Sequence, residues 1–164
     1  MSESNANAAA QPPKEPRQAA LADIARLRAQ AEQDPVLAPW TGAYGGVPPW
    51  DKLKLERVGP GFTTGIALLQ AEVTAIATNP ETATFANTIV ALEDAGRHLH
   101  RLEIMFGVLS GNLNTPEVQA IDREWSPKLA EAYDTITFNR PLFDRIAAVY
   151  AARESTRPQL TAEA

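Results

Sequence analysis

The stretch TFANTIVALEDAGRHLHRLEIMFGVL, residues 84 to 109, decides the fold because apolar side chains recur in it at helical spacing. The members of this stripe are Phe85, Ile89, Leu92, Gly96, Leu99, Leu102, Phe106 and Leu109. Steps of three and four residues put them on one face, so the pattern predicts a single helix of about seven turns. Thr84 is the predicted N-cap, since its hydroxyl can accept a free amide proton in the first turn.

Four more segments of the 164-residue chain repeat this periodicity. The first runs from Arg17 and ends at Asp34-Pro35, because the residue before a proline avoids the helical conformation. The second spans about 61–78, the fourth begins at Thr115-Pro116 in the favoured order of cap and proline, and the fifth covers 142–150 after the break FNRP. Their apolar positions are Leu21, Ile24, Leu27 and Ala31; Phe62, Ile66, Leu69, Val73 and Ile76; Val118, Ile121, Trp125, Leu129, Ala132 and Ile136; and Leu142, Phe143, Ile146, Val149 and Tyr150.

No segment alternates apolar and polar residues as a strand would. The sequence therefore predicts an all-α fold of about five helices, packed largely antiparallel. Pro127 lies inside the fourth helix and predicts a kink or a split there.

A long segment rich in proline and glycine, PVLAPWTGAYGGVPPWDKLKLERVGPG, follows the first helix. Loops of this length are functional or are held by their own side chains. Trp40, Tyr44 and Trp50 are predicted to anchor this loop on the helices, with ligand stacking as the alternative. The glycines of GPGFTTG, residues 59–65, lack the strand and the Gly-Lys-Ser/Thr of a phosphate-binding loop, so a turn into the second helix is predicted.

Composition limits the classes of function. The net charge of −5 argues against a nucleic-acid partner, which needs a basic face. Without cysteine there is no thiol nucleophile or thiolate zinc site. No apolar run reaches the roughly 20 residues that cross a bilayer, and the start lacks the pattern of a secretory signal, so we expect a cytoplasmic protein without membrane contact. Residues 1–16 and 153–164 are predicted to be mobile tails around a helical domain at 17–152.

The two histidines, His98 and His100, are the first candidates for chemistry. Residues two apart on a helix point to faces about 200° apart, so they cannot easily share a metal ion, and the His-Glu-x-x-His motif is absent. The sequence favours solvated surface pairs over a metal or acid–base site. The pairs considered are Asp94 with His98, Glu93 with Arg97, His100 with Glu103, Glu124 with Lys128, and Glu131 with Asp134.

Ser110 and Ser126 have no histidine base within local reach along the sequence. The sequence therefore predicts no catalytic, cofactor-binding or metal-ligating residue in this chain.

Three blocks nevertheless resemble one family. NPETATFANTIVALEDAG, residues 79–96, is similar to the Pro-x-Phe-x-Asn-Thr-Ile-x-Ala-Leu-Glu-x-x-Gly element in the N-terminal helical region of the zinc oligopeptidases. GVPPWDKLKLERVGPGF, residues 46–62, resembles a preceding Pro-Pro-Phe-Asp-Lys block of that family. VQAIDREWSPKLAEAYDTITFNRPLFDRIAAVY, residues 118–150, resembles a following one. The resemblance covers about 34–152 and is strongest to bacterial peptidyl-dipeptidases.

This resemblance implies a nearly all-helical enzyme in which these helices form part of a channel wall, while zinc is held several hundred residues further on. It implies a piece of a zinc-dependent enzyme that removes dipeptides from peptide C-termini, inactive by itself and partnered by the catalytic portion. Zinc is expected only in the full-length enzyme. The alternative is a free-standing helical module that binds a peptide or protein on exposed apolar helix faces.

Overall fold

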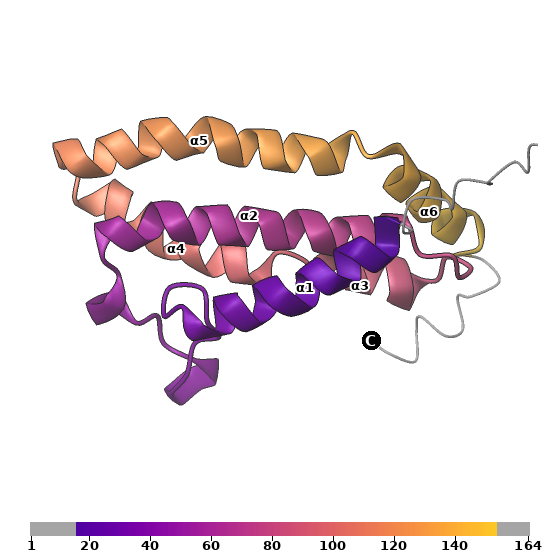
Figure 1. Ribbon diagram of the computed structural model, residues 1–164, viewed down its shortest axis with the longest axis horizontal. Helices are drawn as coiled ribbons and strands as arrows, with labels where there is room; N and C mark the ends of the chain where they lie inside the picture. The colour runs from indigo at the N-terminus through magenta and orange to yellow at the C-terminus, as the bar shows by residue number, and fades with distance from the viewer. Residues whose placement is uncertain (1–15, 154–164) are drawn as a thin grey trace, which may run out of the picture.

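The computed structural model describes residues 16–153, and their fold is all-α, as predicted (Figure 1). The long helices in this range are α1 (Pro16–Gln33), α2 (Leu55–Ala77), α4 (Arg97–Asn112), α5 (Pro116–Thr137) and α6 (Arg140–Ala151). Shorter turns are η1 (Ala43–Gly45), η2 (Trp50–Lys52), the π-helical η3 (Phe85–Val90) and α3 (Ala91–Asp94). Apart from Pro16 and Arg153, the two predicted tails lie outside the described residues.

Helix α2 is the centre of the fold and contacts α1, α4, α5 and α6. Figure 1 shows α1, α4 and α5 running along α2, with successive long helices reversing direction and α6 closing one end. The core contains an aromatic group in which Phe62 of α2 meets Phe106 of α4 edge-on, with ring centroids 5.7 Å apart, and Trp125 of α5 at 5.4 Å. The predicted antiparallel arrangement is confirmed.

The predicted start of the second helix near Gly61 is wrong, because α2 begins at Leu55 and continues through Pro60. Its glycines are positions of close helix contact. A Cβ on Gly59 would lie 3.4 Å from the Trp125 indole, and one on Gly61 would lie 2.7 Å from Leu102. The glycines of GPGFTTG therefore allow α4 and α5 to approach, and the turn expected there does not exist.

The predicted third helix is also wrong in one respect, since it is broken at Ala95 and Gly96. Ala95 is extended (ψ 144°), and Gly96 is left-handed (φ 76°), a conformation that glycine adopts without steric strain. A Cβ on Gly96 would lie 2.9 Å from Leu69 of α2, so the break also needs glycine for space.

The loop between α1 and α2 is held by residues other than those predicted. Val36 and Leu37 are fully buried in the core. By contrast, Tyr44 is fully exposed and Trp50 is exposed, while Trp40 is half-buried. The anchoring role predicted for the three aromatic residues is therefore wrong for Tyr44 and Trp50, and the apolar pair directly after α1 performs it instead.

Other helix ends agree with the sequence. Thr115 caps α5 by accepting a hydrogen bond from the Val118 amide, with Pro116 in the first turn. Asn139 caps α6 at the predicted break.

Pro127 lies inside α5 without splitting it. Within residues 16–153, no helix combines the length and apolar character needed to cross a membrane.

Candidate functional site

The motif TFANTI forms the entry to the segment between α2 and α4, and its polar side chains close a capping box. The Thr84 hydroxyl accepts from the Asn87 amide (3.1 Å), and the Asn87 side-chain oxygen accepts from the Thr84 amide (2.8 Å). The Asn87 side-chain amide also donates to the Thr82 carbonyl (3.0 Å). The N-cap predicted at Thr84 is confirmed, and Asn87 completes the box by satisfying amides that a helix start leaves free.

Arg145 of α6 joins this motif to the far end of the chain. Its guanidinium donates to the carbonyls of Asn79 (2.7 Å) and Glu81 (3.0 Å), and to the side-chain oxygens of Asn87 (2.8 Å) and Thr88 (3.3 Å). Arg145 is buried, and the four atoms that accept from it are neutral oxygens. Its Nε has no hydrogen-bond partner among the described residues, so the four bonds from the two terminal nitrogens hold this buried charge and fix the 79–88 segment against α6.

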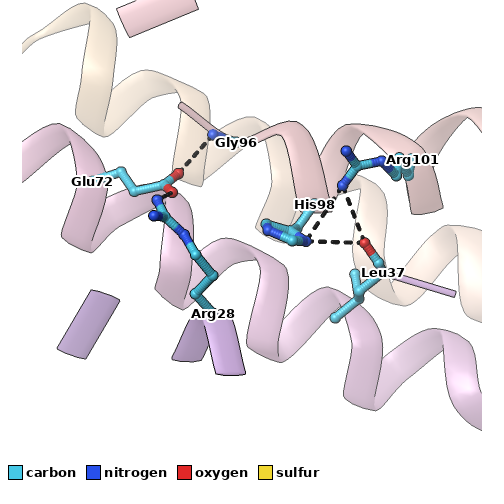
Figure 2. A network of polar contacts seen from close by, with 6 residues as sticks. All are labelled: Arg28, Leu37, Glu72, Gly96, His98 and Arg101. Carbon is cyan, nitrogen blue, oxygen red and sulfur yellow. Dashed lines mark hydrogen bonds and ion pairs between the residues drawn. The ribbon is translucent and has the colours of Figure 1, made fainter. Parts of the chain in front are cut away.

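Glu72 of α2 holds the break between α3 and α4 (Figure 2). One carboxylate oxygen accepts from Arg28 of α1 at 2.8 Å, and the other accepts from the Gly96 amide at 2.8 Å. The Glu72 side chain is only 10% exposed, whereas Arg28 is half exposed. The carboxylate therefore ties three segments together at the point where the predicted continuous helix is interrupted.

His98 lies on the inner side of α4, next to this break (Figure 2). Its Nδ1 is 3.0 Å from the Leu37 carbonyl, which also accepts from Arg101 at 3.3 Å. The same Nδ1 lies 3.4 Å from the Arg101 guanidinium, and it donates to the Leu37 carbonyl in the tautomer that carries the proton on Nδ1. Burial, together with the nearby Arg97 charge, lowers the pKa of Arg101. The surface role predicted for His98 is wrong: this residue is buried and fastens the start of the α1–α2 loop to α4.

His100 points the other way, as the spacing of the two histidines predicted, and its side chain is 70% exposed. Its Nδ1 lies 3.8 Å from Glu103, whose carboxylate accepts a 2.7 Å hydrogen bond from the Tyr133 hydroxyl of α5. Burial and the Glu103 carboxylate raise the pKa of Tyr133 above its ordinary value. This cluster joins α4 to α5 at the surface.

Of the remaining predicted pairs, one forms in the structure and another is replaced. Lys128 donates to Glu124 at 2.8 Å, as expected, and both side chains are about half exposed. Arg97 pairs with Asp94 rather than with Glu93. Among residues 16–153, no group of three or more His, Cys, Asp or Glu side chains could hold a metal ion.

An open hollow of about 360 Å³ lies between α1, α2 and the α3 segment. Charged side chains of both signs line it, namely Arg17, Arg28, Glu72 and Asp94. Arg17 donates to the Ala75 carbonyl at 3.0 Å, and Arg28 is paired with Glu72. The arrangement links helices by polar contacts, and its lining residues include no histidine, serine or cysteine.

Sequence comparison identifies relatives of this chain. No family model matches it. Over 108 residues, or 66% of the chain, it is 37% identical to a dipeptidyl carboxypeptidase of Escherichia coli and 32% identical to one of Salmonella typhimurium. That segment spans only 16% of each relative. The predicted resemblance is thus confirmed: the chain is related in sequence to the bacterial dipeptidyl carboxypeptidases, or peptidyl-dipeptidases.

Proposed function

We propose that this chain is the helical wall portion of a peptidyl-dipeptidase-like metallopeptidase, and that the reaction centre belongs to another part of that enzyme. The observation that carries the proposal is the 37% identity to a dipeptidyl carboxypeptidase over 66% of the chain. In this proposal the catalytic portion is the partner, and zinc is bound there rather than by these helices.

The contacts of the polar residues favour a structural role for these helices. His98 fastens a loop, Glu72 holds a helix break, and Arg145 fixes the 79–88 segment. Each of these side chains is buried against backbone groups. A wall built in this way contributes shape and exclusion of water, while polarising a peptide carbonyl requires a Lewis acid or a set of donors beside the scissile bond.

A replacement experiment tests this function. The matched 108-residue segment of the Escherichia coli enzyme is exchanged for the corresponding residues of this chain, and release of C-terminal dipeptides from a short peptide is measured. We expect activity that a chelator abolishes. A well-folded chimera without activity would contradict the proposal; chimeras carrying shuffled segments of equal composition serve as negative controls.

A free-standing binding module is the second candidate, because exposed apolar residues can bind a peptide or protein as well as a catalytic portion. Ile104, Val108 and Leu113 are exposed in and directly after α4. Contiguous apolar surface commonly mediates association. Size-exclusion mass and binding of a hydrophobic dye separate the candidates: a compact monomer that does not bind dye indicates an autonomous module, and a chain that binds dye or associates indicates a wall without its neighbour.

A further inference from the structure

The two faces of helix α4 have different surroundings. Its inner face places Leu99, Leu102 and Phe106 in the core. The opposite face contains Arg97, Arg101, Ile104, Val108 and Gly111. These five residues step by four and three, so at 3.6 residues per turn they form one stripe along the helix. We call them the outer stripe of α4.

The middle of the outer stripe is apolar and open. Ile104 and Val108 are adjacent on the stripe, four residues apart, and are 38% and 47% exposed. Neither side chain is one of the buried residues that form the hydrophobic core cluster. Two β-branched apolar residues are therefore presented outward from a helix whose other face is already filled.

Two glycines beside Ile104 and Val108 also indicate a surface that another element can approach. A Cβ placed on Gly107 or on Gly111 would have no atom within 4 Å. At Gly61, Gly65 and Gly96 a Cβ would instead meet another helix at 3.1 Å or less, so those glycines serve the contacts of this chain. Glycine weakens a helix unless close approach of another element requires it. Gly107 and Gly111 leave room for such an element against the outer side of α4.

The N-terminal end of the outer stripe carries positive charge. Arg97 and Arg101 lie one turn apart, and only Arg97 has a carboxylate partner among the described residues, namely Asp94. Arg101 donates to the Leu37 carbonyl and is partly exposed along the same edge. A segment that covered the stripe would gain a charge-assisted contact from an acidic side chain near this end.

We propose that the outer stripe of α4 is the surface on which the catalytic portion of the peptidyl-dipeptidase-like enzyme packs, through an apolar helix with an acidic residue opposite Arg97 and Arg101. The inference rests on the proposed function. The relatives suggest the occupant: the matched segment is 16% of their length, so most of their chain lies outside it and can supply a segment that covers the outer stripe. The glycines allow the closer helix–helix distance, about 8 Å between axes.

The test uses single-cysteine variants, in which maleimide labels only the introduced thiol because the chain has no cysteine of its own. Val108→Cys places a thiol on the outer stripe, and Leu21→Cys places one on α1 with a matched exposure of the native residue, 48% against 47%. Maleimide labelling is followed by mass in the isolated chain and in the chimera with the Escherichia coli enzyme. We expect labelling of the Val108→Cys thiol to slow on the order of tenfold or more in the chimera, since a covered thiol reacts only when the interface opens. Labelling of the Leu21→Cys thiol should not change.

An active chimera in which both thiols react as fast as in the isolated chain would overturn the docking surface and leave the proposed function intact. An inactive chimera would count against the proposed function. In that case the isolated Val108→Cys chain is mixed with the remaining portion of the Escherichia coli enzyme as a separate polypeptide: selective protection supports the inference, and equal labelling of both variants overturns it.

A steric variant gives an independent reading. A Cβ at Gly111 meets no atom within 4 Å, so Gly111→Leu should leave the isolated chain with a Tm no lower than that of wild type. In the chimera the same change should reduce dipeptide release and restore fast labelling at the Val108→Cys position. Unchanged release and unchanged protection would contradict close approach at this point.

Discussion

The Arg145 guanidinium donates to the Asn87 side-chain oxygen at 2.8 Å across 58 residues of sequence, and so joins α6 to the capping box of η3. The two residues belong to two of the blocks shared with the peptidase family, and the contact makes those blocks one structural unit. Asn87 uses the same oxygen to accept from the Thr84 amide. The motif is therefore explained by the geometry of a helix entry rather than by chemistry on a substrate.

Replacing Arg145 should destabilise the fold more than replacing any exposed arginine. Arg145→Ala removes four hydrogen bonds and a buried side chain, and we expect a loss of about 2–4 kcal/mol in the free energy of unfolding, measured in urea. Arg140→Ala is the control, because its ion pair with Asp144 is mostly exposed and should contribute below about 1 kcal/mol. Equal losses in the two variants would contradict the role of Arg145. Arg145→Lys should remain below wild type, since an ammonium lacks the forked donors.

The two histidines should differ in their effect on the loop. His98→Ala removes the contact with Leu37 and leaves space beside α4, so we expect a loss of about 1–3 kcal/mol and faster proteolysis between Trp40 and Trp50. His100→Ala should change stability by less than about 0.5 kcal/mol, because the side chain is exposed. Proteolysis at the same rate in both variants would show that His98 does not hold the loop.

Two glycine-to-alanine changes should have opposite signs. In Gly65→Ala the new Cβ would lie 3.1 Å from the Leu99 Cα, a backbone atom that cannot easily move, so we expect a loss of about 1–3 kcal/mol. In Gly107→Ala the Cβ meets nothing within 4 Å, and the helix should gain about 0.5–1 kcal/mol. Thermal unfolding of the two variants measures both changes. A lower Tm for Gly107→Ala would mean that another contact occupies this side of α4.

The stability of the chain should fall at high pH through Tyr133. Because the folded state raises the pKa of this phenol, the folded chain retains the proton at a pH where the unfolded chain loses it. The contribution is complete below the unfolded value of about 10 and is lost as the pH rises beyond it. Urea unfolding on both sides of about pH 10 should show a smaller alkaline loss for Tyr133→Phe than for wild type. Tyr44→Phe, at a fully exposed position, should behave as wild type.

The sequence predicted those features that depend on neighbouring residues. The period of the apolar stripes predicted the helices, and hydroxyl caps predicted the starts at Thr84 and Thr115. The resemblance to the family also came from short stretches of neighbouring residues. Local signals suffice for such features because capping and amphipathic spacing act within one or two turns.

The features that the sequence did not predict depend on contacts between distant segments. The segment GPGFTTG predicted a turn into the second helix, but Gly59 lies inside α2 against Trp125, from a helix more than sixty residues later. Tertiary contact thus overrides the low helix propensity of Gly59 and Pro60. Likewise, His98 is buried because Leu37 offers a carbonyl 61 residues away, which no local spacing reveals. Arg145 and Glu72 were not singled out for the same reason.

Whether the reaction centre lies outside these helices is tested by turnover of the purified chain in the presence of zinc. Turnover is followed as release of dipeptides from the C-terminus of a short peptide, and equilibrium dialysis measures the bound metal. We expect no release above that of the peptide alone and no stoichiometric zinc. Chelator-sensitive release together with one bound zinc per chain would contradict this expectation, because the reaction centre would then lie among these helices.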